Sequence, residues 1–188
     1  MELTEAQWQT AIRHATAANF PAPGSRIAPN VVMLTLAALV GDVQQIMASH
    51  AQYSEAPATW RTWAFTRSGL AQVEATFDAE RYDAIEDRQR RQPRSVSKPP
   101  ADPKTLTARM LPLRTASSFA VVRVYHHSGV GPIGDFYEDF TPLEIEIGFG
   151  RSSVSVGIDT MFDDQAKRER WEEFVSAARQ AVMKGGSE

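Results

Sequence analysis

The sequence predicts an α+β fold in which an N-terminal helical pair precedes a bent antiparallel β-sheet or barrel of about seven strands, closed by a C-terminal helix. Two patterns predict this class. Apolar residues first recur at helical spacing, whereas from Trp60 onward they mostly alternate with polar residues until one final amphipathic helix. Successive strands without helices between them are typical of an antiparallel sheet rather than a parallel βαβ sheet.

The length of 188 residues suits one domain with a helical appendage. We expect residues 1–55 to form a helical segment packed on the rest of the chain. Residues 56–188 are expected to form the antiparallel β-domain and its C-terminal helix.

The first helix is predicted over Thr4–Ala18. Thr4 with Gln7 forms a capping box, and Leu3 with Trp8 is spaced for a hydrophobic staple. A second helix is predicted over Val31–His50, with Asn30 as its cap. Its first half is apolar almost all round, which indicates burial against the β-domain or against another copy of the chain.

The β-region begins with a hairpin formed by Trp60–Thr66 and Leu70–Phe77, followed by a weaker third strand over Arg81–Glu86. Residues Asp87–Lys104 combine several arginines and lysines with four prolines, which predicts a mobile loop.

Further strands are predicted at residues 105–110 and 119–126, with a glycine-rich loop over Gly129–Gly134. A hairpin then joins Leu143–Phe149 to Ser153–Ile158, because apolar residues alternate with polar or small ones in both segments. The C-terminal helix opens at Asp163 and Asp164, and its apolar residues fall on one face: Trp171, Phe174, Val175, Ala178 and Val182.

From Trp60 to Val182 this order of strands and one helix bearing Trp171 resembles a pleckstrin-homology-like domain. The resemblance implies a bent barrel closed by the helix, with Trp171 packed into the barrel mouth, and it implies a binding or scaffold function. Members that bind phosphoinositides carry a basic cluster on the first two strands. This chain offers only Arg61 and Arg67 there, beside Glu74, so headgroup binding is not carried over.

Composition narrows the possible partners. A net charge of −3 gives no general attraction to nucleic acid or anionic membranes, so a nucleic-acid partner is not expected. The chain has no cysteine, which excludes disulfides and thiolate chemistry. No signal peptide is evident, and the longest apolar run, Val31–Val40, is about half of the ~20 residues that cross a bilayer. We therefore expect a soluble cytoplasmic protein without membrane insertion.

Two groups of residues are candidates for binding. Imidazoles and carboxylates near a glycine loop would suit a metal site or acid–base chemistry, although neighbouring residues of a strand point to opposite faces: His126, His127, Asp135, Glu138 and Asp139. A basic stretch would suit an anionic ligand: Arg88, Arg90, Arg91, Arg94 and Lys98. Solvated surface is the simpler interpretation of both groups.

Catalytic motifs are missing from the sequence. It contains no Gly-x-Ser-x-Gly, no phosphate-binding Gly-x-x-x-x-Gly-Lys and no dinucleotide fingerprint. The leading hypothesis is a non-enzymatic protein-binding or scaffold domain without a cofactor, with a protein partner and a homodimer through residues 31–47. The alternatives are a small hydrolase or metal-dependent enzyme using His126 or His127 with the nearby carboxylates, and weak anion binding through residues 88–98.

Overall fold

The computed structural model describes residues 3–17, 27–84, 87, 102–130, 136–158 and 165–185. Within them the chain is α+β with two antiparallel sheets. The helices are α1 (Glu5–Ala15), α2 (Asn30–Val40) and α4 (Gln165–Gly185), with short 3₁₀ turns η1 (Val43–Gln45) and η2 (Leu113–Thr115). The strands are β1 (Ala48–Ser54), β2 (Thr59–Phe65), β3 (Gly69–Phe77), β4 (Pro103–Pro112), β5 (Ala116–Val130), β6 (Phe136–Phe149) and β7 (Ser152–Gly157).

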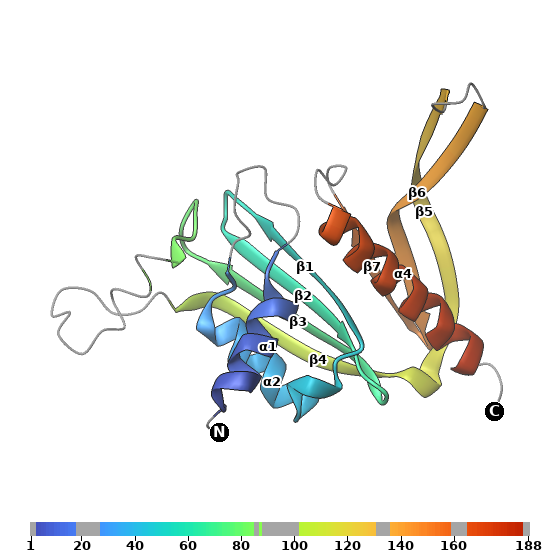
Figure 1. Ribbon diagram of the computed structural model, residues 1–188. Coiled ribbons are helices and arrows are strands. Elements are labelled where there is room, and N and C mark those ends of the chain that lie inside the picture. The colour runs from blue at the N-terminus through green and yellow to red at the C-terminus, as the bar shows by residue number, and fades with distance from the viewer. Residues whose placement is uncertain are drawn as a thin grey trace, which may run out of the picture.

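The strands divide into a four-stranded sheet in the order β1-β2-β3-β4 and a three-stranded sheet in the order β5-β6-β7. Figure 1 shows α1 and α2 on one face of the larger sheet and α4 between the two sheets. The predicted α+β class, its antiparallel strands and its C-terminal helix are confirmed. The predicted barrel is not formed, because β4 and β5 follow each other in the chain but belong to different sheets.

Helix α1 begins where its capping residues predict. The Thr4 hydroxyl accepts a hydrogen bond from the backbone N–H of Gln7. The side-chain oxygen of Gln7 accepts one from the backbone N–H of Thr4, which completes the capping box. The far end of the helix is fixed to the sheet, since Trp60 donates its indole N–H to the Ala15 carbonyl at 3.0 Å.

The prediction of one helix over Val31–His50 is wrong beyond Val40. Helix α2 ends at Gly41, which has φ of 76° and so occupies backbone space that disfavours other residues. No atom lies within 4 Å of a Cβ built on Gly41, so it does not serve the close helix packing that the sequence suggested. Asn30, expected as the cap, lies inside the helix.

Residues 48–54 form strand β1, which the sequence did not indicate. β1 pairs with β2 along its whole length, from Ala48 opposite Phe65 to Ser54 opposite Thr59. Most of β1 is buried on both faces, which removes the apolar–polar alternation that identifies a strand. The four-stranded sheet consequently spans the boundary expected between residues 55 and 56.

The hairpin of β2 and β3 is confirmed, with Phe65 opposite Leu70 beside the turn. The third strand predicted over Arg81–Glu86 is wrong for its described part, since residues 81–84 belong to no strand. Tyr82 is instead buried, and its backbone N–H donates to the hydroxyl of Tyr53 at 2.8 Å. The chain therefore leaves the sheet at Phe77.

The stretch predicted as a mobile loop, Asp87–Lys104, lies largely outside the described residues. Its two ends are ordered parts of the fold. Asp87 is buried and accepts a hydrogen bond from the Tyr82 hydroxyl at 2.9 Å, while Pro103 begins β4. In the same way Gly129 and Val130, assigned to a loop from sequence, are the last residues of β5.

Two hydrophobic cores lie on opposite faces of the four-stranded sheet. The first unites α1 and α2 with that sheet and buries Val32, Met33 and Leu36 of α2. These side chains are thus covered within the chain, and the reasoning that led to a homodimer through residues 31–47 does not apply to them. The second core joins Trp63 and Phe65 to α4 and the smaller sheet.

Trp171 lies at the centre of the second core. It is fully buried and donates its indole N–H to the Pro142 carbonyl at 2.6 Å, so it connects α4 to β6. The expectation that this tryptophan packs into the β-structure is confirmed in this coarser form, between two sheets rather than in a barrel mouth.

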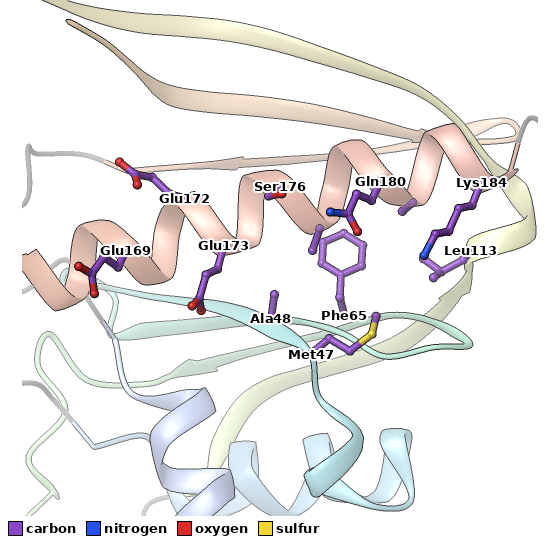
Figure 2. A pocket seen from close by; sticks show the side chains of 12 residues that line it. Met47, Ala48, Phe65, Leu113, Glu169, Glu172, Glu173, Ser176, Gln180 and Lys184 are labelled. Carbon is purple, nitrogen blue, oxygen red and sulfur yellow. The ribbon is translucent and has the colours of Figure 1, made fainter.

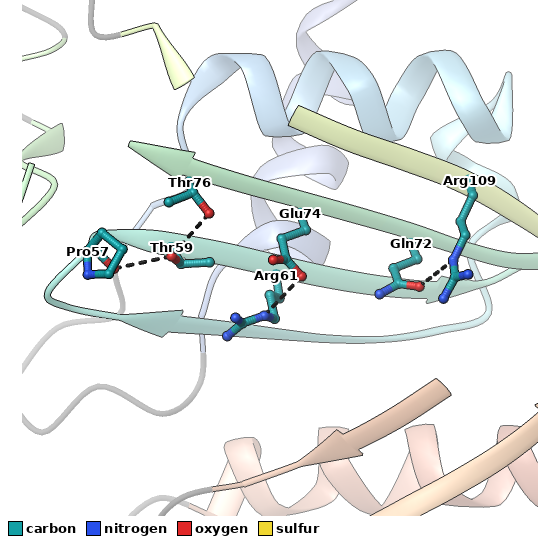
Figure 3. Close-up of polar contacts among 7 residues, drawn as sticks. All are labelled: Pro57, Thr59, Arg61, Gln72, Glu74, Thr76 and Arg109. Carbon is teal, nitrogen blue, oxygen red and sulfur yellow. Dashed lines mark hydrogen bonds and ion pairs between the residues drawn. The ribbon is translucent and has the colours of Figure 1, made fainter. Parts of the chain in front are cut away.

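The face of the larger sheet that carries Trp63 becomes polar away from α4. Arg61 pairs with Glu74 at 3.1 Å, and Arg109 donates to the Gln72 side chain at 2.8 Å (Figure 3). These groups therefore satisfy one another across neighbouring strands. Arg61, one of two basic residues considered for headgroup binding, has its charge balanced within the sheet.

Candidate functional site

The distal part of the smaller sheet is a two-stranded ribbon, which we name the arm and define as Val121–Val130 of β5 with Phe136–Pro142 of β6. β7 pairs with β6 only as far as Glu144, which is opposite Arg123, so the arm has no third strand beyond Arg123. Figure 1 shows it extending past β7 and α4. A two-stranded ribbon has little core of its own and is marginally stable unless another surface supports it.

Large apolar side chains on the arm are exposed. Directly opposite residues of an antiparallel pair share one face, and on this basis Val130 and Phe136 share a face with Phe140 and Val124. Their exposed fractions are 70% for Val130, 68% for Phe136 and 59% for Phe140. Ser128 and Glu138 lie between Phe136 and Phe140 on this face, so the surface is largely but not wholly apolar. Exposed apolar side chains gathered in this way are a recognised mark of a protein-interaction site.

The predicted ligand residues on the arm do not converge. His126 stacks on Phe140, with ring centroids 4.6 Å apart, and its Nε2 lies 3.9 Å from a Glu138 carboxylate oxygen. His127 is opposite Asp139 on the other face of the ribbon. The two histidines thus belong to different faces, as the geometry of a strand requires.

Among the described members of that group, Asp139 does not join His126 and Glu138. Asp139 lies 3.9 Å from a guanidinium nitrogen of Arg168, and Asp135 is outside the described residues. Among the residues that the structure describes, no three His, Asp or Glu side chains are grouped so that they could hold a metal ion. The basic residues Arg88, Arg90, Arg91 and Arg94 also fall outside the described ranges.

A groove of about 670 Å³ runs between α4 and the start of β1 (Figure 2). Its floor and one wall are apolar, formed by Met47, Phe65 and Leu113. Glu169 and Glu173 line the α4 side. The groove is therefore amphipathic, and it shares Glu169 and Glu173 with a smaller polar cavity of about 360 Å³ beside Ser49.

That polar cavity is organised by Arg170. Its guanidinium donates to the carbonyls of His14 at 2.7 Å, Thr16 at 3.3 Å and Ser49 at 3.3 Å. Burial, and secondarily the charge of Arg13, lowers the pKa of Arg170 to about 10, so it remains charged at neutral pH. Arg170 thus satisfies carbonyls at the end of α1 and in β1.

Ser49 and His14 form a hydrogen-bonded pair in this cavity, with 2.8 Å between Oγ and Nδ1. Such a pair is the first requirement of a serine nucleophile. Here the hydroxyl is buried and also accepts a hydrogen bond from Arg170 at 3.2 Å, which occupies its approach. Burial, with Arg13 and Arg170 nearby, lowers the pKa of His14 to about 4, which makes it a weak base. We interpret the pair as structural.

Sequence reasoning singled out neither His14 nor the second buried histidine, His50. Its ring lies among Trp63, Trp171 and Phe174, with centroids 6.0, 4.8 and 5.9 Å away. Burial, and then the charge of Arg170, lowers its pKa to about 3, against a hydrogen bond to the Gly157 backbone. Its Nε2 has no hydrogen-bond partner among the described residues. The imidazole is therefore neutral and part of the core.

The exposed arm and the Arg170 cluster both escaped sequence reasoning, for different reasons. The valines and aromatics of the arm have the composition of buried strands, and only the absence of a third strand exposes them. Arg170 contacts Ser49 and His14, which are more than 120 positions away in the chain, and no local sequence pattern predicts such a contact.

Compared with protein-family models, with curated proteins and with solved structures, the chain matches none of them. In the part of the chain that the structure describes, no helix combines the length and apolarity that crossing a membrane requires.

Proposed function

We propose that this protein is a non-enzymatic binding module that holds another protein through the apolar face of its arm. The observation that carries the proposal is the concentration of exposed large apolar side chains on one short ribbon. Seven of them are on the arm: Val121, Val122, Val124, Tyr125, Val130, Phe136 and Phe140.

The energetic reason is the cost of leaving this surface in water. Burial of apolar area contributes roughly 25 cal/mol per Å², so covering a few such side chains stabilises a complex by several kcal/mol before ordering costs. Arg123 is paired with Glu144, and Glu138 lies beside His126 on the same face as Phe136 and Phe140. The partner that fits this face is therefore mainly apolar, with a polar group where it meets Glu138.

An enzymatic function receives less support from the same geometry. The histidines and carboxylates of the hydrolase hypothesis are divided between two faces, and the Ser49–His14 pair is occupied by Arg170. The pleckstrin-homology-like resemblance remains a proposal. Its support is that a four-stranded and a three-stranded antiparallel sheet are accompanied by a C-terminal helix with a buried tryptophan, Trp171. The two sheets do not close into a barrel, and in this respect the chain departs from the resemblance.

The proposal is tested by photo-cross-linking in the native host. A photoreactive residue at Phe140 is expected to give an adduct with another protein, and the double variant Val130→Ser/Phe136→Ser is expected to abolish that adduct. Met183→Ser is the matched control, because Met183 is 69% exposed but lies on α4. An absence of adducts at Phe140, or an adduct that survives the double variant, contradicts the proposal.

A further inference from the structure

The two sheets of the described residues have four edge strands, and three of them are protected. Helix α4 packs against β1, and the Ser49 carbonyl on this strand accepts a hydrogen bond from Arg170. β4 begins and ends with Pro103 and Pro112. β7 is only six residues long. Proline, charge, shortness and covering are the means by which natural sheets prevent pairing with other chains.

β5 is less protected: α4 packs against its first part, where Arg179 lies over the Phe119 ring, and register shifts occur at Val121–Val124, but its remaining length is uncovered in the described part of the chain. It runs for 15 residues, is mostly exposed, and contains no proline, lysine, aspartate or glutamate. Its single arginine, Arg123, is turned to its own chain, where it donates to the Ile158 carbonyl at 2.8 Å and lies 3.7 Å from Glu144. A long edge without these protections is a template for another strand.

The side chains along this edge are suited to a strand of the same sequence. If a second β5 lies antiparallel with Arg123 at the two-fold axis, Val122 is opposite Val124 and Val121 is opposite Tyr125. All four are exposed in the single chain, and aromatic or β-branched pairs of this kind stabilise neighbouring strands. The register shifts between β5 and β6 fall at Val121–Val124, so this pairing requires the free edge of β5 to be regular on the side that faces away from β6.

We infer that β5 pairs with β5 of a second copy of this chain, which joins two three-stranded sheets into one six-stranded sheet in a two-fold dimer. A second copy fits better than a charged partner strand, because β5 has no lysine, aspartate or glutamate to attract one and its single arginine is turned to its own chain. Two-fold dimers with the same patch on both subunits are the commonest oligomers. The inference rests on the proposed function only in that both use the arm.

The first test is the mass of the protein in solution by light scattering. A dimer has twice the chain mass of 20.8 kDa. The variant Val122→Lys/Val124→Lys places like charges opposite each other and is expected to raise the dimer Kd by about tenfold or more. Leu34→Lys, an exposed apolar site on α2, is expected to leave the Kd unchanged. A wild-type protein that stays at 20.8 kDa at high concentration overturns the inference, as does a dimer unaffected by the two lysines.

The second test uses the absence of cysteine in the chain, because an introduced thiol is then the only one. Arg123→Cys, at the two-fold axis, is expected to form disulfide-linked dimers readily under mild oxidation. Val122→Cys is expected to do so far more slowly, because its own copy lies diagonally across the axis, and Met183→Cys is not expected to do so at all. Equal cross-linking at all three positions contradicts the pairing. The two proposals fail separately: a monomer whose Phe140 still cross-links to another protein removes only the dimer, and a dimer without such an adduct removes only the proposed function.

Discussion

Arg170 contacts Ser49 twice, through its Nε to the backbone carbonyl at 3.3 Å and through its Nη2 to the side-chain Oγ at 3.2 Å. The same Nη2 donates to the His14 carbonyl at 2.7 Å. One planar guanidinium therefore joins α4, the edge strand β1 and the end of α1, three elements that are far apart in the sequence.

We predict that Arg170→Met lowers the free energy of unfolding by about 3 kcal/mol, because the carbonyls of His14, Thr16 and Ser49 lose their donor in a buried place. Urea denaturation measures the change. Arg170→Lys is expected to recover only part of it, since an ammonium group cannot reach three acceptors with the planar fork of arginine. Full recovery by lysine would show that charge alone matters.

Stability is predicted to fall with acid because of His50. The unfolded chain binds a proton as the pH falls through about 6.5, while the folded imidazole, with a pKa of about 3, stays neutral. The stability that the neutral His50 contributes is complete above pH 6.5 and is lost as the pH falls toward 3. The loss amounts to about 2 kcal/mol of unfolding free energy by pH 5. Urea denaturation at pH 7 and pH 5 measures this loss.

The variant His50→Leu isolates that contribution. It removes the titrating group and is expected to reduce the loss of stability between pH 7 and pH 5 by about 2 kcal/mol. His14→Gln is expected to act in the same direction, because burial also lowers the pKa of His14, to about 4. An unchanged pH dependence in both variants would contradict the assignment of acid sensitivity to these buried rings.

Two variants separate the contribution of the Trp171 hydrogen bond to stability from the contribution of its buried ring. Trp171→Phe loses the bond to the Pro142 carbonyl and a part of the ring, with an expected cost of about 2 kcal/mol. Trp171→Ala leaves a cavity between α4 and both sheets and is expected to cost about 4 kcal/mol. Equal losses in thermal or urea unfolding for the two variants would mean that the bond, rather than the packing, dominates.

The end of α2 depends on the backbone freedom of Gly41. Gly41→Ala is expected to cost about 1 to 2 kcal/mol, because its positive φ is unfavourable for a residue with a Cβ even though no neighbour obstructs that atom. Thermal unfolding measures the shift. Ala37→Gly, a buried position within the same helix, serves as the contrast, where the cost comes from helix propensity and lost packing instead.

Several elements follow from local sequence because their signals are local. The capping box of Thr4 and Gln7 predicts the start of α1, and the alternation of Trp60–Thr66 and Leu70–Phe77 predicts the β2–β3 hairpin. The apolar face of Trp171, Phe174 and Ala178 likewise predicts α4 and the side that it buries. In these segments propensity, periodicity and final burial agree.

The sequence by itself thus determined the α+β class, the order of most elements and the buried face of α4 with Trp171 and Phe174. Only the tertiary structure decided that residues 48–54 are a strand, because that segment is buried on two faces and carries no alternation. It also decided that the valines of β5 are exposed and that Arg170 reaches Ser49. Exposure and long-range contacts depend on which elements become neighbours, and no local pattern encodes that.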